Sequence, residues 1–162
     1  MADNGSGGVF PHLRPQLLED VGLVAALELL AAQFMERRPI RVSVESEAAC
    51  RDGGEPQGAI ALCLYRVAQE ALNNVAKHAR ARRGQMQLSR TPDGGWALRI
   101  ADDGRGLGAG DRRKPGSFGL RGMAERVRAL GGELLVSSEG GRGVVVTARV
   151  GPGVAPKTEA GS

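Results

Sequence analysis

Apolar and polar residues follow two different periods in the first half of the chain. Between residues 15 and 38 the apolar positions recur every three or four residues, which predicts one amphipathic helix that ends before Pro39. Residues 40–45 alternate between apolar and polar, as in a half-buried strand. A loop rich in glycine at 52–56 then precedes a longer helix, predicted from 57 to 81.

The second half of the chain predicts two strand pairs separated by a loop and a helix. The predicted ranges are strands 83–90 and 96–101 around a turn at 91–95, a loop at 104–116, a helix at 117–130, and strands 133–138 and 144–150. The loop is too rich in glycine and charge to be core, so it is expected to form a lid over a bound ligand. Ser117 is placed to cap the last helix and Gly131 to end it.

This order of elements predicts one α+β domain, a two-layer sandwich in which an antiparallel or mixed sheet carries its helices on one face. The other face is expected to meet either solvent or a part of the protein absent from this chain. A length of 162 residues fits a single domain. Residues 13–150 are assigned to it, with 1–12 as a linker or expression remnant and 151–162 as a disordered tail.

Composition argues against several classes of function. The formal net charge of +4 is spread along the chain and aromatic residues make up only 3%, so direct nucleic-acid binding by base stacking is not expected. Cys50 and Cys63 lack metal-ligand spacing, which favours a reduced, cytoplasmic protein without zinc or disulfides. No apolar run approaches the roughly 18 residues that cross a bilayer, so no membrane contact is expected for this part of the protein.

Polar residues form a stripe on the second predicted helix. Glu70, Asn74 and His78 recur at every fourth position and therefore share one face, with Asn73 and Lys77 beside it. Apolar residues of the same helix face the other way. A stripe of this kind above a buried core is suited to hold a metal ion and phosphate groups.

Three motifs follow one another along the chain. Residues 69–79 contain the polar stripe, residues 102–107 read Asp-Asp-Gly-Arg-Gly-Leu after a strand, and residues 118–127 begin with Phe-Gly-Leu. Together with residues 13–27 they resemble the catalytic ATP-binding domain of bacterial sensor histidine kinases, in the superfamily that includes DNA gyrase B. The short-lid nitrate-sensor and hexose-phosphate-sensor type is the most similar in these motifs. The resemblance spans residues 13–150 and implies a Bergerat-type (GHKL) fold with a mostly antiparallel mixed sheet and a short ATP lid.

The resemblance implies roles for three of these residues. Asn74 would coordinate a Mg²⁺ ion that bridges the ATP phosphates, because a hard cation prefers oxygen ligands. Asp102 would accept a hydrogen bond from the adenine amino group, which favours ATP over GTP. Glu70 would act as a general base toward the incoming histidine nitrogen, or else would only orient a metal-bound water or pair with an arginine.

Further ATP contacts are implied along the same motifs. They are Asn73, Lys77 and His78 on the helix, Gly104, Gly106 and Leu107 after the strand, and Ser117, Phe118, Gly119, Leu120 and Val144 around the lid and the last strand. The glycines after the strand would allow close backbone approach to the nucleotide. Gly119 and Leu120 would form the far hinge of the lid and open a helix whose N-terminal amides face phosphate.

Three departures from the family pattern bear on these roles. Ser117 stands where a glycine is usual, which changes the lid hinge. Val144 stands where a threonine is common, which removes a hydroxyl contact of about 1 kcal/mol. The phosphoacceptor histidine is not found, since His12 and His78 are each followed by an apolar residue rather than an acidic one.

The implied activity is transfer of the ATP γ-phosphate to a histidine on a dimerisation domain that this chain lacks. The phosphate would then pass to the aspartate of a response regulator with a LuxR-like DNA-binding domain. Residues 13–38 would include the transition helix from the dimerisation domain. Two other functions remain open, namely an anti-sigma-factor serine kinase of the same fold and a non-catalytic nucleotide-sensing module in which Ser117 and Val144 mark decayed function.

Overall fold

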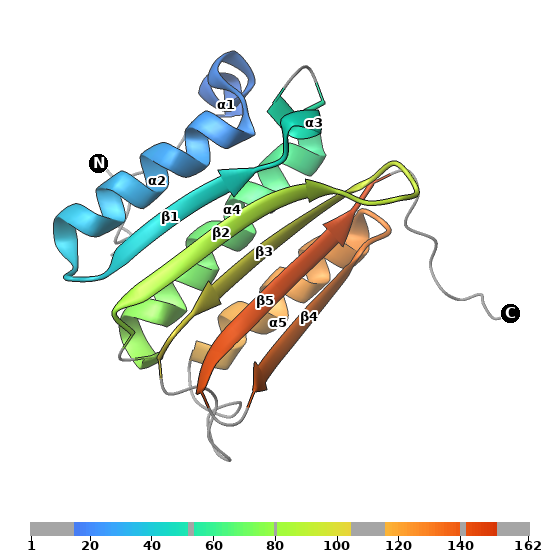
Figure 1. Ribbon diagram of the computed structural model, residues 1–162. Coiled ribbons are helices and arrows are strands. Elements are labelled where there is room, and N and C mark those ends of the chain that lie inside the picture. Colours follow the sequence, from blue (N-terminus) through green and yellow to red (C-terminus); the bar gives the residue numbers. More distant parts are fainter. Residues whose placement is uncertain (1–14, 52–53, 80, 105–115, 140–141, 152–162) are drawn as a thin grey trace, which may run out of the picture.

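A single sheet and its helices make up the described part of the chain. The computed structural model describes residues 15–51, 54–79, 81–104, 116–139 and 142–151 (Figure 1). The helices are α1 (Pro15–Val21), α2 (Leu23–Arg37), α3 (Ala48–Arg51), α4 (Gly58–Asn74), the π-helical turn η2 (Val75–Ala79) and α5 (Gly116–Ala129). The strands are β1 (Arg41–Ser46), β2 (Arg83–Arg90), β3 (Trp96–Asp102), β4 (Glu133–Glu139) and β5 (Arg142–Val150). Within these ranges, no helix has the length and apolar character needed to cross a membrane.

The strands lie in the order β1-β2-β3-β5-β4 (Figure 1). β1 runs parallel to β2, and every other neighbouring pair is antiparallel. Parallel neighbours need a long crossover connection, and the segment from α3 through η2 supplies it. The predicted α+β sandwich with a mixed, mostly antiparallel sheet is therefore confirmed.

Helices cover one face of this sheet. α4 and α5 lie across it, and α2 packs along β1 (Figure 1). The strand residues that face the helices are almost completely buried, among them Met86 on β2 and Leu98 and Ile100 on β3. Leu64 of α4 and Phe34 of α2 are also fully buried. Removal of these side chains from water is the main driving force for the fold.

The opposite sheet face is polar. Gln87 Nε2 donates a hydrogen bond to Glu45 Oε1 at 3.2 Å, and Arg99 Nη1 donates to Gln87 Oε1 at 3.4 Å, so a chain of contacts crosses three strands. Further along, Arg149 Nη1 lies 3.8 Å from Glu133 Oε2. Of the two expectations for this face, contact with solvent fits these polar groups.

A break at Gly22 divides the first predicted helix into α1 and α2. Gly22 has a φ of 87°, and its N–H donates to the Leu18 carbonyl at 2.8 Å, which ends α1. The Glu55 carboxylate, from the loop before α4, accepts the N–H of Val24 at 3.0 Å and so caps α2. The prediction of one continuous helix is therefore wrong. The apolar spacing gives no sign of the break, because it continues from α1 into α2.

Three details of the other helices also differ from prediction. The short helix α3 was not predicted, and the second long helix changes from α4 to the wider turn η2 after Asn74. The last helix begins at Gly116, so Ser117 lies inside its first turn and is not the residue before it. Its end is as predicted, because Gly131 has a φ of 79° and the Gly132 N–H donates to the Val127 carbonyl at 3.0 Å.

Candidate functional site

Several segments meet at one edge of the sheet. β3 ends with Asp102, which pairs with Gly84 at the start of β2, and Ala101 pairs with Val145 near the start of β5. α4 and η2 end at this edge and α5 begins near it (Figure 1). The fold therefore gathers the polar end of α4, the end of β3 and the start of α5, as the ATP-site prediction requires.

The polar stripe of α4 lies above a buried apolar side. Val67 and Leu72 are 0% exposed, whereas Glu70, Asn73 and Asn74 are half-buried. Asn73 Oδ1 and both amide atoms of Asn74 are shielded from solvent, and within the described residues they have no hydrogen-bond partner. Buried amide groups are normally paired, so these atoms mark a place that a bound group would complete.

The donor set at Asn74 fits a hard cation. Mg²⁺ binds amide oxygens and keeps several of its own waters, so one side-chain oxygen from the protein is a sufficient anchor when phosphates supply others. Elsewhere in the described ranges, no group of three or more histidine, cysteine or acidic side chains could hold a metal ion. Among the described residues, Asn74 therefore has the chemistry to hold the metal that the resemblance implies.

The stripe does not continue unchanged past Asn74. The five residues of η2 form a wider turn than an α-helix, so the every-fourth-residue spacing that places His78 on the stripe ends at Asn74. Lys77, in the same turn, is exposed. Only the backbone of His78 is described. π-Helical turns are frequent at functional sites, and this one follows directly after the expected metal ligand.

Asp102 is a partly buried acceptor at the end of β3. The alternation of the strand places it on the same face as Ile100, toward the helices. Its Oδ1 accepts the Gly104 N–H at 2.8 Å, and the Val144 N–H also contacts the carboxylate. Burial raises the pKa of Asp102 above its ordinary value of 3.8, an effect that the two N–H donors oppose and the neighbouring Asp103 reinforces. A desolvated carboxylate of this kind is suited to recognise an amino group.

Asp103, which the sequence argument did not assign, has a structural role. Its Oδ1 accepts the backbone N–H groups of Arg82 at 2.8 Å and Arg83 at 3.0 Å, and so fixes the start of β2. Burial alone would raise the pKa of Asp103, but these N–H groups and the Arg83 charge bring it below 3.8. The two adjacent aspartates therefore have different roles. Asp102 lies at the candidate site, and Asp103 stabilises the start of β2.

Gly143 is a site residue that sequence reasoning missed. It has a φ of 62°, its N–H donates to the Gly104 carbonyl at 2.6 Å, and a β-carbon there would overlap the Asp102 carbonyl oxygen. The signal in the sequence is the Gly-Arg-Gly run just before the last apolar strand. Val144, next to it, reaches Asp102 through its backbone, so the missing hydroxyl does not affect that contact.

Gly119 brings the start of α5 against α4. A β-carbon at this position would overlap Oε2 of Glu70 and would lie 2.9 Å from Glu70 Cγ. The residue expected at the lid hinge therefore touches the residue expected to act as a base. Neither sequence spacing nor composition relates these two positions.

The remaining expected contacts are only partly described. Gly104 is buried and receives the Gly143 N–H. Gly106 and Leu107, with most of the predicted lid, lie outside the described residues. For Ser117, Phe118 and Leu120 only the backbone is described, in the first two turns of α5.

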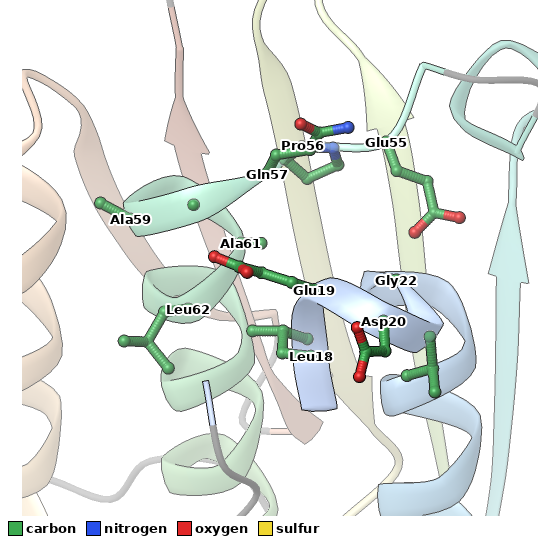
Figure 2. A pocket seen from close by; sticks show the side chains of 12 residues that line it. Leu18, Glu19, Asp20, Gly22, Glu55, Pro56, Gln57, Ala59, Ala61 and Leu62 are labelled. Carbon is green, nitrogen blue, oxygen red and sulfur yellow. The ribbon is translucent and has the colours of Figure 1, made fainter. Parts of the chain in front are cut away.

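A separate hollow lies at the other end of α4. It has a volume of about 990 Å³ and is lined by α1, Gly22, the loop residues 55–57 and the beginning of α4 (Figure 2). Glu19, Asp20 and Glu55 contribute carboxylates to its lining, and Leu18 and Leu62 contribute apolar surface. None of the residues expected to bind ATP lines it, so it is distinct from the site at Asn74 and Asp102.

Known proteins resemble this chain in sequence. Residues 60–153 match the family described as histidine kinase-, DNA gyrase B-, and HSP90-like ATPase. The sensor histidine kinase MctS of Rhizobium johnstonii is 40% identical over 131 residues, which cover 78% of this chain and 27% of MctS. The signal transduction histidine-protein kinase/phosphatase UhpB of Salmonella typhimurium is 39% identical over 143 residues, covering 84% of this chain and 26% of UhpB. The chain thus spans about a quarter of the length of these two relatives.

A solved structure resembles it in fold. The histidine kinase domain of the blue-light activated histidine kinase EL346 of Erythrobacter litoralis superposes with a TM-score of 0.59 at 25% identity, over 82% of this chain and 62% of that one. Both of these relatives and this solved structure are named as histidine kinases, and the segments with the ATP-site motifs meet at one edge of the sheet. The chain belongs to the histidine kinase-, DNA gyrase B- and HSP90-like ATPase family, and its similarity is to the catalytic ATPase domains of sensor histidine kinases.

Proposed function

We propose that this chain binds ATP together with Mg²⁺ at the edge formed by α4, β3 and α5, and donates the γ-phosphate to a histidine on a dimerisation domain of the same protein. The observation that carries this proposal is that Asn73 Oδ1 and both amide atoms of Asn74 are shielded from solvent and have no hydrogen-bond partner in the described part of the chain. The phosphate then passes to a response regulator, for which the subfamily resemblance favours the LuxR type. Free, buried Cys50 and Cys63 support a cytoplasmic location for the domain.

Each residue has a distinct task in this proposal. Asp102 accepts the adenine amino group and so selects ATP over GTP. Asn74 holds Mg²⁺, which offsets the charge of the phosphates when it is bound. Lys77, an exposed cation one turn beyond Asn74, attracts the same phosphates. Glu70 receives the proton that leaves the acceptor histidine nitrogen as the nitrogen–phosphorus bond forms.

Calorimetric titration with a non-hydrolysable ATP analogue tests the binding half of this proposal. We expect binding that strengthens with Mg²⁺ and no binding of the matching GTP analogue. In Asn74→Ala the gain from Mg²⁺ should be lost while weak metal-free binding remains, because only the metal ligand has been removed. A gain from Mg²⁺ that survives this substitution would remove Asn74 from the metal site.

Phosphotransfer tests the catalytic half. The chain alone is not expected to label itself with phosphate from ATP, but it should label the parent protein's dimerisation domain when that domain is supplied in trans. Acid-labile phosphate on His12 or His78 would contradict this division of labour. Nucleotide binding without any transfer would instead favour the nucleotide-sensing module, and transfer to serine would favour the anti-sigma-factor kinase.

A further inference from the structure

The carboxylate of Glu70 lies against Gly119, one of three glycines in α5. Any β-carbon at Gly119 would overlap Glu70 Oε2, and the Glu70 Cγ lies only 2.9 Å from that β-carbon position. Contacts closer than about 3.0 Å do not occur for real β-carbons. Glu70 can therefore keep this position between α4 and α5 only while position 119 is glycine, because any side chain there would force the Glu70 side chain to move.

The backbone of Gly119 gives no other reason for a glycine. Its φ is not in the left-handed region, and it lies within regular helix. Glycine inside a helix is unfavourable by up to about 1 kcal/mol relative to alanine. Gly122, three residues later in the same helix, has open space around its β-carbon position. What distinguishes Gly119 from Gly122 is its contact with Glu70.

We propose that Gly119 is a positioning residue for Glu70, which it holds in place by letting the backbone of α5 close on the Glu70 side chain. A glutamate has several rotatable bonds, and ordering them costs side-chain entropy. The backbone of α5 at Gly119 leaves the Glu70 side chain fewer conformations than open solvent would. The carboxylate is therefore preorganised for proton transfer. This inference rests on the proposed role of Glu70 as the proton acceptor.

Thermal unfolding separates the steric contact from helix propensity. Gly119→Ala should lower the melting temperature relative to Gly122→Ala, because Glu70 must leave its place or α5 must shift. Gly122→Ala, the matched control, should leave it unchanged or raise it slightly. In a Glu70→Ala background the overlapping atoms are gone, so Gly119→Ala should then behave like the control. If Gly119→Ala does not fold, folding of the Glu70→Ala/Gly119→Ala double variant would likewise show that the contact with Glu70 causes the loss of stability.

Phosphotransfer to the dimerisation domain supplied in trans tests the positioning role. Gly119→Ala should lower kcat by about 10-fold or more, because the carboxylate is displaced. Gly119 is itself an expected ATP contact, so the KM for ATP is measured alongside, and the diagnostic result is whether the loss of kcat depends on the carboxylate of Glu70. Glu70→Gln keeps the shape of the side chain and removes its basicity. In that background Gly119→Ala should still lower the melting temperature but should not lower kcat further.

The outcomes distinguish this inference from the function on which it rests. An unchanged melting temperature and kcat in Gly119→Ala would overturn the positioning role, as would a stability loss that persists in the Glu70→Ala background. A kcat unaffected by Glu70→Gln would instead refute the role of Glu70 in catalysis, and the unfolding data would still show whether Gly119 and Glu70 touch.

Discussion

The backbone of Gly143 lies directly against the carbonyl group of Asp102, so closely that any side chain at position 143 would overlap the carbonyl oxygen. The same glycine donates its N–H to Gly104 at 2.6 Å, just beyond Asp102 in the chain. The start of β5 thus packs closely against the end of β3 at Asp102, the residue expected to accept a hydrogen bond from the adenine amino group. This fit leads to a first prediction.

Gly143→Ala should destabilise the protein by about 3 kcal/mol, because a left-handed φ and a steric overlap with Asp102 are added together. Gly58→Ala is the matched control, since Gly58 has a φ of 60° and nothing near its β-carbon position. It should cost only about 1 kcal/mol. Urea unfolding of both variants measures the two values, and equal losses would mean that the contact with Asp102 contributes nothing.

Asp102→Asn should weaken binding of the ATP analogue by about 10-fold or more, because an amide presents a donor where the adenine amino group needs an acceptor. Asp103→Asn provides the comparison at the neighbouring position. Its carboxylate pairs with the N–H groups of Arg82 and Arg83, so its loss should lower stability and leave nucleotide affinity nearly unchanged. Calorimetry on both variants measures these affinities. A loss of affinity in Asp103→Asn but not in Asp102→Asn would show that the two aspartates were assigned the wrong way round.

The raised pKa of Asp102 predicts how stability depends on pH. Because burial raises it above 3.8, the folded protein binds this proton more tightly than the unfolded chain does. The resulting stabilisation is complete below pH 3.8 and is lost as the pH rises through the raised value. The free energy of unfolding of the wild type minus that of Asp102→Asn should therefore fall over this interval. Asp103, whose pKa is lowered, is present in both proteins, so only its charge interaction with Asp102 enters the difference. A difference that stays flat with pH would show that Asp102 is not desolvated.

Glu55→Gln should destabilise the protein by about 1 kcal/mol, since the charged cap on the N–H of Val24 becomes a neutral one. Nucleotide affinity should be unaffected, because Glu55 lies before the first turn of α4 and Asn74 ends that helix. Unfolding and calorimetric measurements on the same variant check both halves. A loss of ATP-analogue affinity equal to that of Asp102→Asn would indicate that the two ends of α4 are coupled.

Patterns local in sequence predicted most of the fold. The alternation in residues 83–90 and 96–101 predicts β2 and β3, because buried and exposed positions on a strand differ in polarity wherever one sheet face is covered. The break at Gly22 escaped prediction because the group that caps α2 is Glu55, from another part of the chain. The turn η2 escaped because apolar spacing does not distinguish a wide helical turn from an ordinary one.

The site was predicted to a different degree. Asp102 and Asn74 stand in motifs whose residue types suit their chemistry, and the fold brings their elements to one edge of the sheet. Gly143 and the contact between Gly119 and Glu70 depend on which backbones approach each other in space. Such approaches are set by packing between elements, and no periodicity in a single sequence encodes them.

The order of the strands has a thermodynamic consequence for this site. The expected site residues come from four different elements, namely α4, β3, α5 and β5, and further chain separates each of these elements from the next. These residues are Asn74, Asp102, Gly119 and Val144. A fragment that assembles the pocket must therefore extend at least from α4 to β5. Ligand binding and global folding should then be linked, so that a nucleotide at 100 times its dissociation constant adds about 2.7 kcal/mol to the free energy of unfolding.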